Sequence, residues 1–242
     1  MNQGGIVRRV LVTSGPTRAY IDCVRYIANA STGALGSRIV EALTARNIPV
    51  VHLYGYGSER PKVEDSGLFE AIPVTTVDDL VQAVRTAAKR GDIAAVVHSM
   101  AVLDYVPETR IEGKMPSGED HWDIRLVRTP KVIGLMRELM PDACIVAFKL
   151  ESGISDRELV NRAAALMEKH RLDLVVANRM ENIDSPLNPP KGDFSATLSP
   201  PPGGLGGFHE ALFVGAGGQV LARFSTKLDI AAALAGFIAE RL

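Results

Sequence analysis

Short apolar runs alternate along the chain with amphipathic segments of helical period. The apolar runs are continuous and rich in β-branched residues, which is typical of strands that are buried on both faces of a parallel sheet. They predict strands at residues 9–13, 50–54, 70–74, 94–98, 123–128, 145–148 and 174–177. The amphipathic segments predict helices at residues 35–46, 77–89, 131–140, 156–170 and 228–241. Strands that alternate with helices indicate an α/β fold of the Rossmann-like, doubly wound type, in which helices cover both faces of a mostly parallel sheet.

Some segments depart from this alternation within what we expect to be a single domain over residues 1–242. The strand at 123–128 alternates polar and apolar side chains, so we expect it in a small flanking sheet. Residues 184–207 are dense in Pro and Gly, which excludes a regular element and predicts a surface loop. The last elements are expected to be a hairpin of strands 211–214 and 220–224, its turn at 215–218, and a helix cap at Ser225 or Thr226.

The composition excludes several classes of protein. The 242 residues carry a formal net charge of −1, so the chain lacks the excess of Lys and Arg that a nucleic-acid surface needs. No apolar run approaches the roughly 20 residues that span a bilayer, and the N-terminus has no hydrophobic signal region. The 2 cysteines and 5 histidines show no disulfide framework or metal-ligand spacing. We therefore expect a cytoplasmic protein that binds neither nucleic acid nor membrane.

The first predicted strand leads to the first candidate site. It runs into Ser-Gly-Pro-Thr at 14–17, and a polar loop then reaches the Gly-rich start of an amphipathic helix. Free N–H groups and the helix dipole favour an anion such as phosphate at such a point. The pair Gly33 and Gly36 lacks the first glycine of the dinucleotide-binding pattern. The alternative is a helix start that is capped by Ser31 or Thr32, with both glycines serving close packing.

The same stretch resembles the opening signature of phosphopantothenoylcysteine synthetases, in the stand-alone form of the C-terminal domain of the DNA/pantothenate metabolism flavoprotein. The positions in register are Gly15, Thr17, Asp22, Val24, Arg25, Asn29, Ser31, Thr32, Gly33 and Gly36. Further segments resemble that family in the same order: HSMAVLDYVP at 98–107, GKMPS at 113–117, IRLVRTPKVI at 124–133, AFKLES at 147–152 and DLVVAN at 173–178. The resemblance covers about residues 8–180.

This resemblance implies a phosphopantothenate–cysteine ligase of coenzyme A biosynthesis. The implied substrates are 4′-phosphopantothenate, cysteine and a nucleoside triphosphate, either CTP or ATP, with Mg²⁺ as cofactor and an acyl-nucleotide as intermediate. A homodimer is implied as well. Nucleotidylation gives the carboxylate a leaving group, so the protein needs mainly to position the reactants and to neutralise phosphate charge.

The resemblance also implies roles for individual residues. Asn29 and Lys114 correspond to a catalytic asparagine and to the lysine of a mobile lid, here residues 109–121. Asp104 corresponds to an aspartate of the nucleotide site, and its carboxylate suits Mg²⁺. The other nucleotide-binding candidates are Gly15, Ser31, Thr32, Gly33, Thr129, Pro130, Phe148 and Lys149. The basic residues on the family's next helix have no clean match here; of Arg162, Lys169 and His170, Arg162 is the candidate that we choose. The substrate-binding candidates beside Asn29 are Met100, Ala101 and Asn178.

Plainer interpretations of the same residues stay open. Asn29 and Asp104 are residue types that favour turns, and Lys114 lies in a polar loop where a solvated lysine is ordinary. The chain also departs from the family pattern at two points. No further basic residue follows Lys114 in its loop, and Arg179 stands where the family commonly has Asp.

Two other functions also stay open. A short-chain reductase that uses NAD(P) shares the fold, but it needs Tyr-x-x-x-Lys, and no tyrosine here has a lysine four residues on. A non-catalytic nucleotide-binding protein of the same fold is the other alternative. Ser14 and Ser99 have no partnership with His and Asp that the sequence reveals, and a nucleophilic role for Cys23 is disfavoured.

Overall fold

An eight-stranded sheet runs through the centre of the molecule in the order β12-β11-β10-β9-β6-β1-β4-β5. The computed structural model describes residues 7–63, 67–118, 120–180 and 210–242. The strands of this sheet are β1 (Arg9–Ser14), β4 (Val50–Gly55), β5 (Phe69–Val74), β6 (Ile93–His98), β9 (Cys144–Ser152), β10 (Leu174–Met180), β11 (Ala211–Val214) and β12 (Val220–Phe224). The strands from β5 across to β10 are parallel, whereas β11 and β12 add an antiparallel edge. The predicted α/β fold with a mostly parallel sheet is confirmed.

The order of the strands reverses between β1 and β6. From β1 the chain moves outward through β4 to β5, and it then returns to place β6 on the other side of β1. Open parallel sheets bind ligands at such a switch point, because the connections leave in opposite directions and open a crevice outside the carboxyl ends of the two strands. The topology therefore selects the loops after β1 and β6 as the first place to look for a site.

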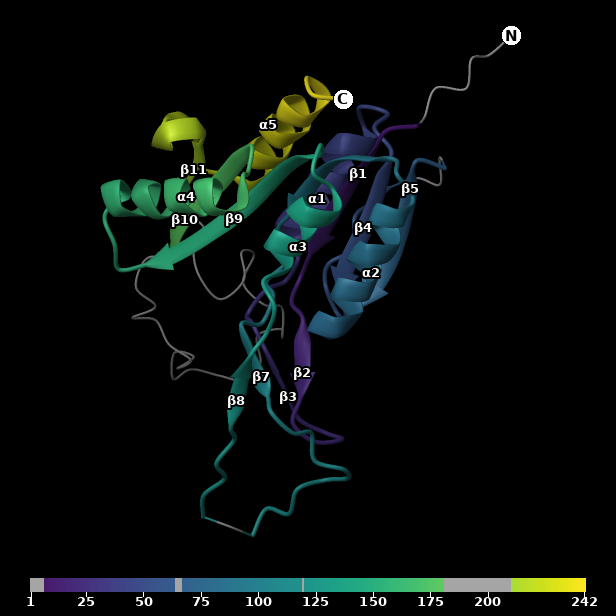
Figure 1. Cartoon of the computed structure of the whole chain (residues 1–242), viewed down its shortest axis with the longest axis vertical. Helices are drawn as coiled ribbons and strands as arrows, with labels where there is room; N and C mark the ends of the chain where they lie inside the picture. Colours follow the sequence, from purple (N-terminus) through teal and green to yellow (C-terminus); the bar gives the residue numbers. More distant parts are fainter. Residues whose placement is uncertain (1–6, 64–66, 119, 181–209) are drawn as a thin grey trace, which may run out of the picture.

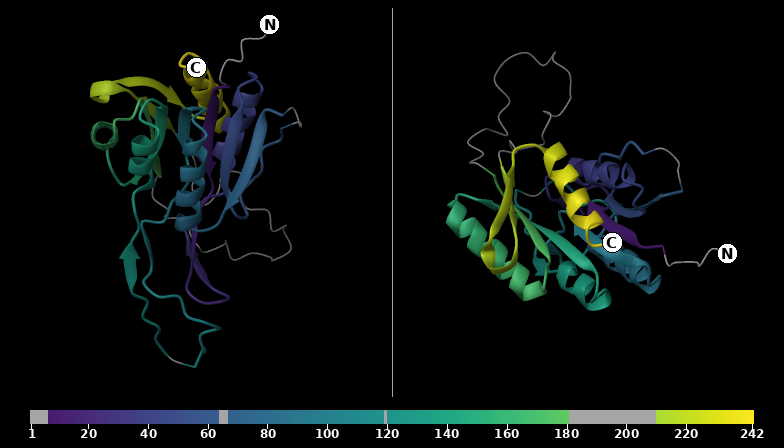
Figure 2. Two further views of the ribbon diagram at one scale, coloured as in Figure 1. Left: turned by 45° about the vertical axis from the view of Figure 1, so that its right-hand side comes forward. Right: turned by 90° about the horizontal axis from the view of Figure 1, so that it is seen from above.

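Helices cover both faces of the sheet (Figures 1 and 2). On one face lie α1 (Ala34–Thr44) and α5 (Lys227–Ala239); on the other lie α2 (Val77–Lys89), α3 (Val132–Leu139) and α4 (Asp156–His170). Successive side chains of β1 point to opposite faces of the sheet. Val10 and Val12 pack against α1 and α5, and Leu11 packs on the face that α2, α3 and α4 cover. All three are 0% exposed, and burial of each such side chain is worth about 1.5–3 kcal/mol.

Side-chain caps begin three of the predicted helices, α2, α4 and α5. The Thr76 hydroxyl accepts a hydrogen bond from Asp79 N, and the Asp79 carboxylate accepts one from Thr76 N, which forms a capping box at α2. Thr226, one of the two predicted candidates, caps α5 by accepting from Asp229 N. These local bonds explain why the starts of these helices could be predicted from the sequence.

Two short ribbons project from the carboxyl edge of the sheet and form an arm (Figure 1; Figure 2, left). One is β2 (Arg18–Tyr20) with β3 (Tyr26–Ala28), and the other is β7 (Tyr105–Pro107) with β8 (Leu126–Arg128). The predicted strand at 123–128 does lie in a small flanking sheet, but only its last three residues form the strand. The expectation that 18–28 is only a loop is wrong, because strands of three residues are too short to show an alternating pattern.

Other boundaries differ from the predictions in ways that affect the site. β9 continues to Ser152 instead of ending at 148, so Lys149 lies inside the strand. The C-terminal hairpin is confirmed, with η1 (Ala216–Gly218) in its turn. The predicted surface loop at 184–207 lies outside the described residues.

Gly36→Ala is expected to destabilise the protein by about 1–3 kcal/mol, because overpacking in a buried contact forces side chains or backbone to shift. A Cβ at Gly36 would lie only 2.1 Å from the Cβ of Ser14, which is fully buried at the end of β1. The matched control is Gly236→Ala in α5, where a Cβ would meet nothing within 4 Å and helix propensity favours Ala. Chemical unfolding measures both variants, and equal stability of the two would show that α1 does not press tightly on β1.

Candidate functional site

Main-chain hydrogen bonds join the loops that follow β1 and β6. Ala101 N donates to Gly15 O at 2.9 Å, and Thr17 N donates to Ala101 O at 3.2 Å. The hydroxyl of Thr17, which is fully buried, accepts a further bond from Leu103 N at 3.0 Å. The two loops therefore form one hydrogen-bonded unit at the switch point of the sheet.

The start of α1 lies directly against this unit. Gly15 and Gly33 have positive φ angles of 76° and 74°. A Cβ on Gly33 would lie 3.2 Å from the Cα of Gly15 and 2.9 Å from the Cβ of Ser58. Both positions therefore need glycine for conformation and for space, which supports the packing role that the sequence left open.

The prediction that Ser31 or Thr32 caps α1 is wrong. The N-cap residue is Gly33, and no side chain makes a cap hydrogen bond there. The hydroxyl of Thr32 accepts only a long contact of 3.4 Å from Ala34 N. A helix start without a side-chain cap leaves N–H groups for another acceptor, and the helix dipole makes an anion the favoured one.

Asn29 connects the arm to the switch point. It is exposed, and its Nδ2 donates to Val102 O at 3.1 Å across the gap between the arm and the loop after β6. The neighbouring substrate candidates differ from one another: the side chain of Met100 is buried in the core, whereas Ala101 is half-buried and bonded through its main chain. The amide of Asn29 therefore presents a polar group at the edge of the crevice, with both donor and acceptor atoms.

Asp104 is joined to the segment that precedes α3. Thr129 N donates to Asp104 O at 3.0 Å, and the Thr129 hydroxyl donates to Leu103 O at 2.6 Å. The Asp104 carboxylate forms an ion pair with Lys131, and both side chains are more than half exposed, at 61% and 62%. Lys131 was not among the predicted site residues. The sequence feature that could have identified Lys131 is its position directly after Thr129 and Pro130, which the family resemblance includes among the nucleotide-binding candidates.

The predicted nucleotide ligands on β9 point to opposite faces of the sheet. Phe148 packs on the side of α1 and α5, whereas Lys149 lies on the side of α4 and forms an ion pair with Glu151 at 2.9 Å. Arg162 of α4 reaches the same carboxylate at 2.8 Å. The predicted candidates Lys149 and Arg162 therefore meet at one carboxylate, and Glu151 is a member of the cluster that sequence reasoning missed.

Residues at the end of β10 complete the neighbourhood of that cluster. Asn178 is half-buried and pairs in register with Leu150 of β9. Arg179, which departs from the family pattern, forms an ion pair with Asp156 at 2.9 Å and donates to Ile154 O at 3.2 Å. Arg179 thus holds the first turn of α4 against the sheet.

Asp22 is a fully buried carboxylate at the tip of the β2–β3 ribbon. It accepts hydrogen bonds from Val24 N and Arg25 N, both at 2.7 Å, and from Met115 N at 3.2 Å, and it forms an ion pair with Arg25. Desolvation acts to raise the pKa of Asp22, but the three backbone hydrogen bonds and the charge of Arg25 outweigh it and hold that pKa below its ordinary value. The carboxylate is therefore ionised when it joins the ribbon to the loop that contains Met115.

That loop carries Lys114, the predicted lid lysine. Cys23 N donates to Gly113 O at 3.0 Å, and Ile111 N donates to Ile21 O at 2.8 Å. Together with the bond from Met115 N to Asp22, these bonds attach the loop to the ribbon on both sides of Lys114, although the loop has no apolar stripe. The side chain of Lys114 itself is exposed.

Two hydroxyl–imidazole pairs, one buried and one partly buried, flank the end of β1. Ser14 Oγ and His52 Nε2 are 2.8 Å apart, and Thr13 Oγ1 and His98 Nδ1 are 2.7 Å apart. The expectation that Ser14 has no histidine partner is therefore wrong. Desolvation lowers the pKa of each imidazole to about 4, so both are neutral at pH 7. Ser14 and His52 are 0% exposed, which keeps a substrate from reaching this pair.

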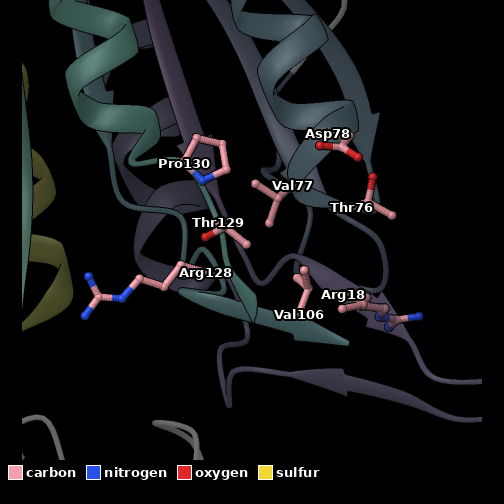
Figure 3. A pocket seen from close by; sticks show the side chains of 9 residues that line it. Arg18, Thr76, Val77, Asp78, Val106, Arg128, Thr129 and Pro130 are labelled. Atoms are coloured by element: carbon pink, nitrogen blue, oxygen red, sulfur yellow. The ribbon is translucent and has the colours of Figure 1, made fainter. Parts of the chain in front are cut away.

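A cavity of about 300 Å³ lies beside the switch point, between the arm and the start of α2. Thr129 and Pro130, both predicted to bind nucleotide, line it together with Val77 and Val106 (Figure 3). Its other lining residues are Arg18, Ala19, Thr76, Asp78 and Arg128. The guanidinium groups of Arg18 and Arg128 point away from it in opposite directions (Figure 3), which leaves an interior that is mainly apolar.

The described part of the chain contains no group of three or more His, Cys, Asp or Glu side chains that could hold a metal ion by itself. Asp104 is a single carboxylate, so it fits Mg²⁺ only together with oxygens from another source, such as phosphate. None of the helices in the described residues has the length and apolar character needed to cross a membrane.

Known proteins resemble this chain over most of its length. The coenzyme A biosynthesis bifunctional protein CoaBC of Thermococcus kodakarensis is 36% identical over 181 residues, which is 75% of this chain and 43% of that protein. Phosphopantothenate–cysteine ligase 1 of Arabidopsis thaliana is 28% identical over an alignment of 227 residues that covers 74% of this chain and 71% of that protein. The crystal structure of the DNA/pantothenate metabolism flavoprotein from Streptococcus pneumoniae shares the fold, with a TM-score of 0.75 at 23% identity over 96% of this chain and 99% of the other.

The first three curated relatives are longer proteins, of which the chain spans 40–43%. Residues 6–193 match the family described as DNA/pantothenate metabolism flavoprotein C-terminal domain. This match includes both loops of the switch point, the arm and the cluster on β9. The chain belongs to the family of the DNA/pantothenate metabolism flavoprotein C-terminal domain.

Proposed function

We propose that the protein is a phosphopantothenate–cysteine ligase of coenzyme A biosynthesis. The observation that carries the proposal is the gathering of Gly15, Gly33, Asn29 and Asp104 around the hydrogen-bonded loops of the switch point. An uncapped helix start, an exposed amide and a carboxylate at one crevice suit a reaction between a phosphate-bearing nucleotide and an acid. The names of the relatives from Thermococcus and Arabidopsis support the same activity.

The proposed reaction has two steps. In the first, a carboxylate oxygen of 4′-phosphopantothenate attacks the α-phosphorus of CTP or ATP, and the bond to pyrophosphate breaks. In the second, the amine of cysteine attacks the acyl carbon, loses a proton, and releases the nucleoside monophosphate. Asn29 would donate to the acyl oxygen, and Lys114 would neutralise the charge that develops on the α-phosphoryl oxygens. Asp104 would help to hold Mg²⁺, which supplies further charge neutralisation on the polyphosphate.

The direct test is release of pyrophosphate. The protein is incubated with 4′-phosphopantothenate, cysteine and Mg²⁺, and with CTP or ATP in separate reactions. Pyrophosphate release that requires phosphopantothenate is expected with at least one nucleotide, and the faster reaction identifies the co-substrate. Absence of release with both nucleotides would favour the alternative of a non-catalytic nucleotide-binding protein. Reduction of a carbonyl substrate with NAD(P)H would favour the reductase.

Asn29→Asp is expected to allow the first step and to stall the second. The carboxylate would repel the acyl oxygen and lacks the N–H donor that Asn29 presents. Mass spectrometry should then detect an acyl-nucleotide that the unchanged protein does not accumulate. Asn47→Asp is the control, because Asn47 is exposed in the turn after α1, at the amino end of the sheet. Unchanged turnover of Asn29→Asp would remove Asn29 from the catalytic site.

Lys114→Gln is expected to slow pyrophosphate release by about 10²-fold or more, which corresponds to roughly 2.7–4 kcal/mol for one charge-stabilising contact. The affinity for nucleotide should change far less, because Lys114 is exposed and would approach the phosphate only when the loop closes. Lys89→Gln, at the last turn of α2, is the matched control. Equal losses in affinity and in rate would make Lys114 a ground-state phosphate ligand.

Apart from Ile111 and Met115, whose N–H groups are bonded to the ribbon, residues 109–118 are expected to exchange amide hydrogens quickly in the free protein and to gain protection when nucleotide, Mg²⁺ and phosphopantothenate bind. Asp22→Asn should speed exchange at Ile111 and Met115, and Asp78→Asn should not, because the carboxylate of Asp22 accepts a hydrogen bond from this loop. The lowered pKa means that the anchor is complete above the ordinary value of 3.8 and is lost as the pH falls through the folded-state pKa. Protection that is the same with and without ligands would contradict the lid.

A homodimer is the proposed assembly, formed through the arm. Its ribbons expose apolar side chains that a second copy could cover: Val24 at 59%, Tyr26 and Tyr105 at 44%, and Leu126 at 41%. Leu126→Asp should shift sedimentation toward the monomer, whereas Leu228→Asp on α5, exposed at 66%, should not. A monomer before any substitution would contradict this assembly.

A cytoplasmic location follows from the same proposal. Cys23 and Cys144, which are the 2 cysteines of the sequence, are both free thiols in the structure. Free thiols are usual in a reducing compartment.

A further inference from the structure

Glu151 bridges two cations that come from different elements. Its Oε1 lies 2.9 Å from Lys149 Nζ on the same strand, and its Oε2 lies 2.8 Å from Arg162 Nη1 on α4. Both carboxylate oxygens are thus used, one for each cation. The contact with Arg162 joins the end of β9 to the middle of α4.

The carboxylate lies deeper than the cations that it joins. Its side chain is 16% exposed, whereas those of Lys149 and Arg162 are 33% and 45% exposed. Glu158 also pairs with Arg162, at 2.6 Å, but it is 49% exposed and belongs to the surface of α4. Glu151 therefore contacts the two cations from the side of the protein interior, and the rest of each cationic group faces the solvent.

The free donors of this cluster suit an anion with several oxygens. An ammonium has three N–H groups and a guanidinium has five, and Glu151 engages only some of them. Without a carboxylate between them, the two like charges would repel each other and the long side chains would move independently. A fixed pair of cations at the carboxyl end of a strand can meet two phosphoryl groups of one molecule at once.

We propose that Glu151 is a positioning residue that holds Lys149 and Arg162 as a clamp for the polyphosphate of the nucleotide. This inference rests on the proposed function for the identity of its ligand. Glu151 does not touch the ligand; it acts through the two cations. A protein kinase uses an ion pair of lysine and glutamate in the same way to aim a lysine at phosphates.

The test is direct binding of inorganic tripolyphosphate to the full chain, measured by titration calorimetry. Glu151→Gln is expected to weaken binding by about tenfold, since coupled charged neighbours interact by an amount of that order. Glu158→Gln is the matched control, and its effect should stay within about twofold, as for an exposed pair on one helix face. In the ligase assay, KM for CTP or ATP should rise for Glu151→Gln while KM for cysteine stays unchanged. Glu151→Asp keeps the charge and should recover part of the affinity.

The opposite result would overturn the inference. If Glu151 only competes with phosphate for the cations, Glu151→Gln will bind tripolyphosphate more tightly; if it serves only the fold, affinity will not change. Should Glu151→Gln fail to fold, Glu151→Asp decides in its place: weaker binding than the unchanged protein supports the clamp, and equal or tighter binding refutes it. Because tripolyphosphate binding needs no ligase activity, a protein that releases no pyrophosphate but shows this binding pattern would refute the proposed function and leave the role of Glu151 standing.

Discussion

The contact between the end of β1 and the start of α1 leaves no space for side chains, and the rest of the site depends on it. A Cβ on Gly36 would meet Ser14, and a Cβ on Gly33 would meet the backbone of Gly15. The positive φ angles of Gly15 and Gly33 restrict these two positions to glycine for a second reason. Because α1 cannot move away from β1 without losing this packing, the positive end of its dipole has a fixed place beside the loops of the switch point.

Carboxylates with little exposure organise the more exposed parts around this fixed centre. Asp22 is fully buried and binds the main chain of the loop that carries Lys114, while Glu151 supports Lys149 and Arg162. In both cases the anion is less exposed than the cations around it. This arrangement suits a protein that binds negatively charged reactants, because the positive groups face the solvent and attract them while the carboxylates are less accessible.

The sequence predicted those features that depend on local pattern. The sheet strands, the helices and the Thr226 cap follow from periodicity and from side-chain to backbone bonds only a few residues apart. The ribbons of the arm escaped prediction because strands of three residues carry no period. The ion pairs of Lys131 and Glu151 and the pairing of Ser14 with His52 form only when distant segments meet, so motif spacing could not reveal these contacts. The contact of Asn29 with the loop after β6 was likewise not predicted; family resemblance alone gave the expectation of a catalytic role for Asn29.

The most direct measurement is an amide NMR titration of the full chain with CTP or ATP in the presence of Mg²⁺. If the switch point is the nucleotide site, the largest shifts will occur at Gly15, at Gly33 and at the loop of residues 100–104, with further shifts on β9 near Lys149. The amides of Val77 and Asp78, on the far side of the cavity beside α2, will change little. Shifts confined to that cavity, with Gly15 and Gly33 unmoved by saturating nucleotide, would contradict the assignment of the site to the carboxyl ends of β1 and β6.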